Sequence, residues 1–112
     1  MTFKTGHRES GQQTRERATL EKLFELSLDM LCVADFDGYF RLINSAFEKI
    51  LGHPRDALLG HPYIEFVHPE DKPATLAAMD QLVAGEPVAC FENRYLCHDG
   101  TYKWIGWTSM PA

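Results

Sequence analysis

Two Asp-Gly pairs, each lying between two apolar runs, constrain the possible fold of this chain more than any other feature. The second pair, Asp99 and Gly100, separates residues 88–97 from residues 101–109, which together are rich in Phe, Tyr, Trp, Ile and Thr. These residue types suit a pleated, half-buried surface. An Asp-Gly pair between such runs is a strong signal of a β-hairpin, because a type I′ turn needs positive φ at both central residues. We therefore predict a hairpin that turns at Asp99 and Gly100.

The first pair, Asp37 and Gly38, lies in the same way between residues 30–34 and residues 39–43. This pattern predicts a second hairpin with the same turn. A lone hairpin is not stable in water, so helices from the rest of the chain must cover one face of these strands.

Composition and charge limit the class of protein. The chain has 112 residues, 45% of them hydrophobic and 24% charged, which is ordinary for a single globular domain. Its net charge of −5 argues against nucleic acid or an anionic membrane as the main partner. No apolar run approaches the ~20 residues of a membrane span. The cysteines Cys32, Cys90 and Cys97 have no metal-like spacing, so we interpret them as reduced thiols and expect a cytoplasmic protein.

The N-terminal part of the chain is expected to contain a flexible segment and then a helix. Residues 1–14 are polar and are predicted to be flexible, and residues 15–29 are predicted to form an amphipathic helix. Its apolar residues recur at three- and four-residue steps, and they are Leu20, Leu23, Phe24 and Leu28. A helix this short does not persist alone in water, so its apolar stripe must pack on its own domain or on a partner's copy.

Residues 30–112 are expected to form the core of the domain, with helices between the two hairpins. Asn44 and Ser45 begin one helix, either with Asn44 as the N-cap or with a Ser45–Glu48 capping box, and Gly52 ends it. A longer helix after the His-Pro-Glu-Asp sequence has an apolar stripe of Leu76, Met79, Leu82 and Val83. The order of strands and helices indicates an α+β fold with an antiparallel sheet.

Six short motifs follow one another along the chain. They are Asp35-Phe36-Asp37-Gly38 with residues 39–44, then residues 47–53, 58–60, 67–71, 91–95 and 99–105. Together, over residues 20–110, they resemble a PAS domain with a C-terminal half of the PAC kind. The resemblance implies a five-stranded antiparallel sheet with helices on one face. It also implies a sensory and interaction module that is attached to a histidine kinase of a two-component system, a diguanylate cyclase (GGDEF) or phosphodiesterase, or a transcription regulator.

One departure from the family concerns its fifth strand, which follows the strand that contains Trp. The sequence ends at residues 110–112, so we expect either a fragment of a larger signalling protein or a sheet that a neighbouring chain completes. In both cases the output domain that the resemblance implies lies outside these residues.

The residues give little support for catalysis or for a metal site. The chain has no Gly-rich phosphate loop, no Gly-x-Ser-x-Gly and no His-Glu-x-x-His. Adjacent acids such as Glu70 and Asp71 at a helix start usually serve the helix dipole. Cys97 and His98 are adjacent, and neighbouring side chains of a strand point to opposite faces. We therefore expect neither an enzyme nor a metal site.

The resemblance raises the question of a cofactor, because some PAS domains bind haem or flavin. Members that form a flavin–cysteine adduct carry a Cys in the short helical region, and residues 63–67 have none. Haem-binding members usually ligate iron through a His on the long helix, and residues 72–84 have none, although His61 and His68 lie nearby. No cofactor is expected, and flavin or haem stays open as an alternative.

A sensor of a small ligand is the alternative function, because a non-covalent ligand needs only a concave apolar pocket with a few polar groups. The candidates for the lining of such a pocket are Phe47, Leu58, Phe66, Leu76, Met79 and Phe91. These side chains can equally form a solid core.

A second copy of the chain is the expected partner. Because side chains alternate along a strand, one of Trp104 and Trp107 should face outward and form an interaction patch, unless the N-terminal helix covers it. The candidates for the interface are Leu20, Leu23, Phe24, Leu28, Trp104 and Trp107. An open sheet edge would also invite pairing. We expect a homodimer, and the alternative is a monomer whose helix folds back over its own sheet.

Overall fold

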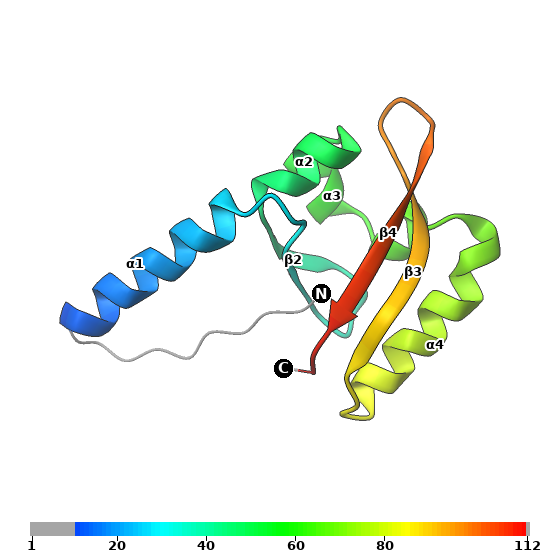
Figure 1. The fold of residues 1–112 in the computed structure, drawn as a ribbon. Helices are drawn as coiled ribbons and strands as arrows, with labels where there is room; N and C mark the ends of the chain where they lie inside the picture. Colours follow the sequence, from blue (N-terminus) through cyan, green and yellow to red (C-terminus); the bar gives the residue numbers. More distant parts are fainter. Residues whose placement is uncertain (1–10, 112) are drawn as a thin grey trace.

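Two pairs of strands are separated by a run of helices in the described part of the chain (Figure 1). This part comprises residues 11–111 of a computed structural model, with side chains from residue 15 onward. The elements in chain order are α1 (Gly11–Leu26), β1 (Cys32–Ala34), β2 (Phe40–Ile43), α2 (Ser45–Leu51), α3 (Arg55–Gly60), the 3₁₀ turns η1 (Tyr63–Phe66) and η2 (Pro69–Asp71), α4 (Lys72–Val83), β3 (Val88–Leu96) and β4 (Tyr102–Ser109). This order and the antiparallel pairing confirm the α+β prediction. The flexibility predicted for residues 1–10 falls outside the described residues.

Both predicted hairpins form, and both glycines have positive φ, 91° at Gly38 and 89° at Gly100. The predicted turn type is wrong, because neither Asp37 nor Asp99 has positive φ. In the first hairpin the N–H of Gly38 donates to the carbonyl of Asp35, whose own N–H donates to the carbonyl of Tyr39. This pattern is a three-residue loop that ends in a left-handed glycine, and the second hairpin repeats it.

The two hairpins form separate two-stranded sheets, β1 with β2 and β3 with β4. The described residues therefore contain four strands in two ladders, where the resemblance implies five strands in one sheet. Helix α4 lies along the β3–β4 hairpin, and α2 and α3 lie near one end of it (Figure 1). An isolated bridge between Val67 and Tyr95 connects the segment before η2 to β3.

A β-bulge changes which residues of β3 face inward. Simple alternation places Val88 on the face opposite to Phe91, but the register shifts between these two residues and Cys90 takes a φ of 57°. The extra residue of a bulge reverses the alternation beyond it, so Val88 is buried on the same side as Asn93 and Tyr95. Periodicity alone does not reveal where a bulge falls.

The core lies where α2, α3 and η1 meet the inner faces of both hairpins. Its largest fully buried apolar side chains are Phe47, Ile43, Leu51, Leu58 and Val67. The predicted stripe of α4 is partly wrong, because Leu76 is 52% exposed and Val83 is also exposed, whereas Thr75 is buried beside Leu82. The helix turns positions 75, 79 and 82 toward the strands, which leaves Leu76 about 100° away from that face.

Helix α1 begins four residues before the predicted start and ends three residues before the predicted end. Residues 11–14 therefore belong to this helix, and Leu28 lies beyond it, where it is 90% exposed. The Ser27 hydroxyl accepts a hydrogen bond from the N–H of Asp29 and forms a local turn there. The helix projects away from the strands and meets the domain near its C-terminal end (Figure 1). Within the described residues, no helix has the length and apolar character that crossing a bilayer requires.

Candidate functional site

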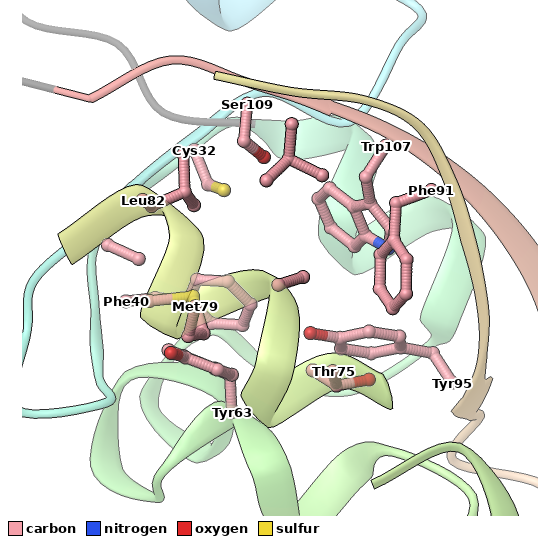
Figure 2. A pocket seen from close by; sticks show the side chains of 13 residues that line it. Cys32, Phe40, Tyr63, Thr75, Met79, Leu82, Phe91, Tyr95, Trp107 and Ser109 are labelled. Carbon is pink, nitrogen blue, oxygen red and sulfur yellow. The ribbon is translucent and has the colours of Figure 1, made fainter. Parts of the chain in front are cut away.

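A small cavity lies between α4, the inner face of the β3–β4 hairpin and the first hairpin (Figure 2). Its volume is about 60 Å³. The lining side chains come from six elements, and they are Cys32, Ala34, Phe40, Tyr63, Thr75, Ala78, Met79, Leu82, Val88, Phe91, Tyr95, Trp107 and Ser109. Most of them are apolar. Their polar groups are four hydroxyls, one thiol and one indole N–H.

The structure brings together two of the six residues predicted to line a pocket. Met79 and Phe91 line the cavity. The other four are Phe47, Leu58, Phe66 and Leu76, of which the first three are buried in the packed core and Leu76 faces solvent. The prediction failed for these four because apolar character marks burial but does not distinguish a filled core from the wall of a cavity.

A buried polar network forms one wall of the cavity. The Asn93 Oδ1 accepts a hydrogen bond of 2.7 Å from the indole Nε1 of Trp107, and its Nδ2 donates at 3.1 Å to Thr75 Oγ1. The Thr75 hydroxyl in turn donates at 2.8 Å to the carbonyl of Asp71. The network links β3, β4 and α4 through side chains, so it fixes how the helix sits on the hairpin.

Two tyrosines and a cysteine bring further polar atoms to the cavity. Tyr63 and Tyr95 are both buried, and the hydroxyl of Tyr95 points into the cavity (Figure 2). Burial raises the pKa of Tyr63 to about 12, with a smaller contribution from the charge of Asp35. Burial also raises the pKa of Tyr95 well above its ordinary value and raises that of the Cys32 thiol. All three groups therefore keep their protons at neutral pH.

The sequence reasoning missed Tyr63, Tyr95 and Asn93 as site residues. A signal was present for two of them, because Asn93 and Tyr95 share the inward face of β3 with Phe91 by simple alternation. Polar atoms at inward positions of a strand require partners. Tyr63 lies in a 3₁₀ turn, and short apolar turns have no periodicity that would predict its orientation.

The four described histidines lie away from this cavity. His61, which is exposed, pairs with Glu65 at 3.3 Å, and the His68 Nδ1 accepts a hydrogen bond from the N–H of Glu70. No group of three or more potential metal ligands gathers anywhere in residues that the structure describes. Neither His61 nor His68 lines the cavity, so neither fits the haem ligand that the resemblance left open.

An ion pair attaches the start of α4 to β3 on the other side of the network. Arg94 binds the two carboxylate oxygens of Asp71 at 2.9 Å each, and the N–H of Arg94 donates to the same carboxylate. These contacts lower the pKa of Asp71 to about 2. Asp71 thus binds the strand instead of capping the helix, and the guanidinium also lies 4.8 Å from the ring centroid of Trp104.

The C-terminal end of α1 joins the domain through a second buried polar side chain. Asn44 has no exposed surface, and its Nδ2 donates to the carbonyls of Phe24 at 2.9 Å and Asp29 at 2.8 Å. Its Oδ1 accepts a hydrogen bond of 3.0 Å from the N–H of Leu31. Asn44 occupies the N-cap position of α2, as predicted, but its side chain does not cap that helix. We call these contacts the Asn44 joint.

Two further contacts strengthen the Asn44 joint. The Ser45 hydroxyl donates at 2.9 Å to the carbonyl of Glu25 instead of forming the predicted capping box with Glu48. Arg55 donates to the carboxylates of Glu25 on α1 and Glu48 on α2, both at 3.1 Å. Both predicted capping groups are therefore used to hold α1, which explains why the capping box is absent.

The apolar stripe of α1 is exposed. Leu23 is 62% and Leu26 is 76% exposed, Leu20 is also exposed, and Phe24 is half-buried. A groove beside the helix is lined by Leu20 and Phe24 together with Leu42 of β2 and with charged side chains that include Arg17 and Arg55. The alternative prediction, in which this helix folds back over its own sheet, is wrong for this structure.

The two tryptophans of β4 lie on opposite faces, as predicted, and only Trp104 is exposed. Trp107 is buried in the core of its own chain, so its inclusion among the interface candidates was wrong. Its indole N–H needs a buried acceptor, and Asn93 provides one. Trp104 is 62% exposed on the outer face, where Arg94 and not α1 packs on it.

Comparison with known proteins agrees with this geometry. A family model described as PAS fold matches residues 40–112, which is more than half of the chain. No curated protein sequence matches the chain significantly.

Several solved structures are similar. A domain of the sensory box sensor histidine kinase/response regulator from Geobacter sulfurreducens is 21% identical, with a TM-score of 0.75 over 85% of this chain and 82% of that one. The PAS domain of an HTR-like protein from Haloarcula marismortui is 29% identical, with a TM-score of 0.70 over 84% and 77%. The N-terminal domain of a diguanylate cyclase with PAS/PAC sensor from Marinobacter aquaeolei is 26% identical, with a TM-score of 0.56 over 64% and 67%.

Proposed function

Because the chain belongs to the PAS fold family, we propose that it is a sensory module that pairs with a second copy and relays a signal through α1 to an output domain. Similar solved domains come from a sensor histidine kinase and a diguanylate cyclase, so a kinase or cyclase is the class of output that we propose. The module itself is proposed to have no catalytic activity, since its buried polar groups are engaged in packing or enclosed in a small cavity.

The observation that carries the proposal is the contrast between the two ends of α1. The C-terminal end is held by a fully buried asparagine and by Arg55, so a change in the domain alters the position of the helix. The rest of the helix exposes Leu20, Leu23 and Leu26. An exposed apolar stripe of this kind on a short helix is stabilised by burial against a partner.

A second copy of α1 is the occupant that we propose for this stripe. The groove beside α1 combines apolar side chains of α1 and β2 with charges of both signs, such as Arg17 and Glu21, on its rim. A two-fold axis would bring the stripe of each copy to the groove of the other, and two-fold pairing is the commonest arrangement of homo-oligomers. Trp104 remains a candidate for the same interface.

The test is the mass of the protein in solution over a concentration series, measured by light scattering. The chain should form a dimer, and Leu23→Asp should shift it to a monomer, because a charge on the stripe would be buried without a partner. Ala18→Asp is the matched control, since residue 18 is exposed on the opposite side of the same helix. A monomer at every concentration, or equal effects of both variants, would refute the proposal.

A second candidate function is the sensing of a small ligand in the cavity beneath α4. The hydroxyl of Tyr95, which points into this cavity without a hydrogen-bond partner among the described residues, favours it. A cavity of about 60 Å³ is far below the roughly 300–1,000 Å³ of pockets for drug-sized molecules. We therefore propose that neither haem nor flavin occupies it. An absorption spectrum of the purified protein with a Soret or flavin band would refute this.

A further inference from the structure

The hydroxyl of Tyr95 is buried in the cavity, and no described residue forms a hydrogen bond with it. Tyr95 is 3% exposed, and its ring packs on Trp107 with a centroid distance of 5.5 Å. Its hydroxyl points toward the space enclosed by α4 and the two hairpins (Figure 2). Buried hydroxyl groups nearly always have a partner, because one without a partner loses its bond to water and gains nothing in return. The position therefore points to a partner that is not part of the described protein.

The neighbouring polar side chains are already engaged with one another. The amide of Asn93 accepts from Trp107 and donates to Thr75, and the Thr75 hydroxyl donates to a helix carbonyl. None of these groups is directed to Tyr95. The hydroxyl of Tyr95 thus stays outside this network, and burial raises its pKa, so it is protonated at neutral pH. A protonated phenol acts mainly as a hydrogen-bond donor.

The surroundings of the phenol favour a neutral ligand. Among the described residues, the lining contains no Lys, Arg, His, Asp or Glu, so a charged ligand would be buried there without a counter-ion from them, which is unfavourable. The carboxylate of Asp35 lies close enough to raise the pKa of Tyr63. Its negative potential disfavours an anion in particular. The ligand therefore needs a hydrogen-bond acceptor that bears no net charge, and a carbonyl oxygen has this property.

The size of the cavity sets an upper limit on the ligand. A water molecule takes up about 30 Å³ of the liquid, and a cavity that binds benzene has about 150 Å³. The volume here is about 60 Å³, which on this scale encloses about two or three non-hydrogen atoms. Because the cavity is partly open to solvent, a ligand of the size of acetone fits with one end at the opening. Met79, Phe91 and Leu82 supply the apolar wall against which the carbon atoms of such a molecule would pack.

We propose that this cavity binds a small neutral carbonyl compound whose oxygen accepts a hydrogen bond from the hydroxyl of Tyr95. The hydroxyl of Tyr63 is a further donor at the same cavity, and side chains of α4 form one of its walls. This inference rests on the second proposed function, the sensing of a small ligand, and it names the chemical class of that ligand.

The experiment is a titration of the labelled chain by two-dimensional NMR with acetone, with acetate and with 2-methylpropene. The three probes have the same shape, but acetate adds a charge and 2-methylpropene lacks the acceptor. Acetone should give saturable shifts in the amide signals of α4 and β3 near Met79 and Phe91. The other two probes should bind more weakly.

Tyr95→Phe tests the hydrogen bond itself. It should weaken acetone about tenfold, the effect of one lost hydrogen bond, and leave 2-methylpropene unchanged. Tyr102→Phe is the control, because Tyr102 lies on β4 outside the cavity. Without a ligand, Tyr95→Phe should raise the melting temperature, since it removes an unpaired buried hydroxyl.

Each other outcome overturns the inference in a recognisable way. If water molecules alone occupy the cavity, no probe gives saturable shifts and Tyr95→Phe lowers the melting temperature. Saturable binding of acetate without acetone refutes the neutral carbonyl and leaves ligand sensing intact. Equal affinity of acetone for Tyr95→Phe and the unaltered chain refutes the role of the hydroxyl. The relay function is judged separately, by the mass of the protein in solution.

Discussion

Two asparagines that are almost completely buried hold two regions of this molecule together in different ways. In the Asn44 joint, the side chain binds only backbone atoms, namely the N–H of Leu31 and the carbonyls of Phe24, Ser27 and Asp29. The atoms that it binds are present whatever side chains those positions carry. The joint therefore fixes the path of the chain between α1 and β1.

Asn93 lies in the region where α4 meets the β3–β4 hairpin, and it binds side chains instead. Its partners are the indole of Trp107 and the hydroxyl of Thr75, which lie on two other elements. If Asn93 were removed, the indole N–H of Trp107 would be buried without a partner, and the Thr75 hydroxyl would keep only its bond to the carbonyl of Asp71. The network therefore depends on the complete core, whereas the joint can open locally. From this difference we expect the connection of α1 to open more readily than the core.

The largest effect is expected at the core asparagine. Asn93→Ala removes the partners of Trp107 and Thr75 and leaves a small cavity, so it should lower the free energy of unfolding by about 3 kcal/mol. Urea denaturation measures this value. Glu92→Ala is the matched control, because Glu92 is the preceding residue of β3 and is exposed. If the two variants unfold at the same urea concentration, the network does not stabilise the core.

A smaller and local effect is expected at the joint. Asn44→Ala leaves the N–H of Leu31 and three carbonyls without this partner, which should lower the free energy of unfolding by about 2 kcal/mol. Hydrogen exchange should accelerate in α1 and much less in β3 and β4. Ser45→Ala, which loses one hydrogen bond to the carbonyl of Glu25, should have a weaker effect of the same kind. Equal loss of protection in α1 and in the hairpin would mean that the two regions open together.

An effect of about 1–2 kcal/mol is expected at the turn of the long hairpin. Gly100→Val should lower the free energy of unfolding by this amount, because a residue with a Cβ resists the left-handed conformation. Gly100 has a φ of 89°, and a Cβ there would meet no other atom, so the effect of Gly100→Val is conformational. Gly106→Val provides the control, because that position has equal space without a positive φ. Thermal unfolding should separate the two variants, and identical melting temperatures would argue against strain at Gly100.

The smallest effect is expected on the stability of the protein at acidic pH. The pKa of Asp71 is about 2 in the folded chain, below the ordinary 3.8, because Arg94 binds its carboxylate. The folded state therefore binds fewer protons than the unfolded state between these two pKa values. The stability that Asp71 contributes is complete above about pH 4 and is lost as the pH falls toward 2. The Asp71 side chain is 15% exposed, so solvent weakens the effect. Urea denaturation at several pH values measures how the free energy of unfolding falls below about pH 4. This fall should be smaller for Asp71→Asn than for the unaltered chain, and an equal fall would show that Asp71 does not cause it.

Much of this architecture could be predicted from local patterns. Gly38 and Gly100 mark both hairpins, because the left-handed conformation of a turn favours a residue without a Cβ. Gly52 ends α2 in the same conformation, as expected. Alternation placed Trp104 and Trp107 on opposite faces, and the ordered motifs indicated the family. These features depend on residues a few positions apart, so the sequence determined them by itself.

The site depended on contacts between distant segments. Simple alternation placed Asn93 and Tyr95 on one face, but only the packing of α4 enclosed a cavity there. The same packing turned Thr75 inward and Leu76 outward, and it decided which tryptophan was buried. The rotation of a helix against a sheet is set by how all of their side chains fit together. Because that fit involves residues far apart in the chain, no local pattern contains it, and the tertiary structure alone decided where the cavity lies.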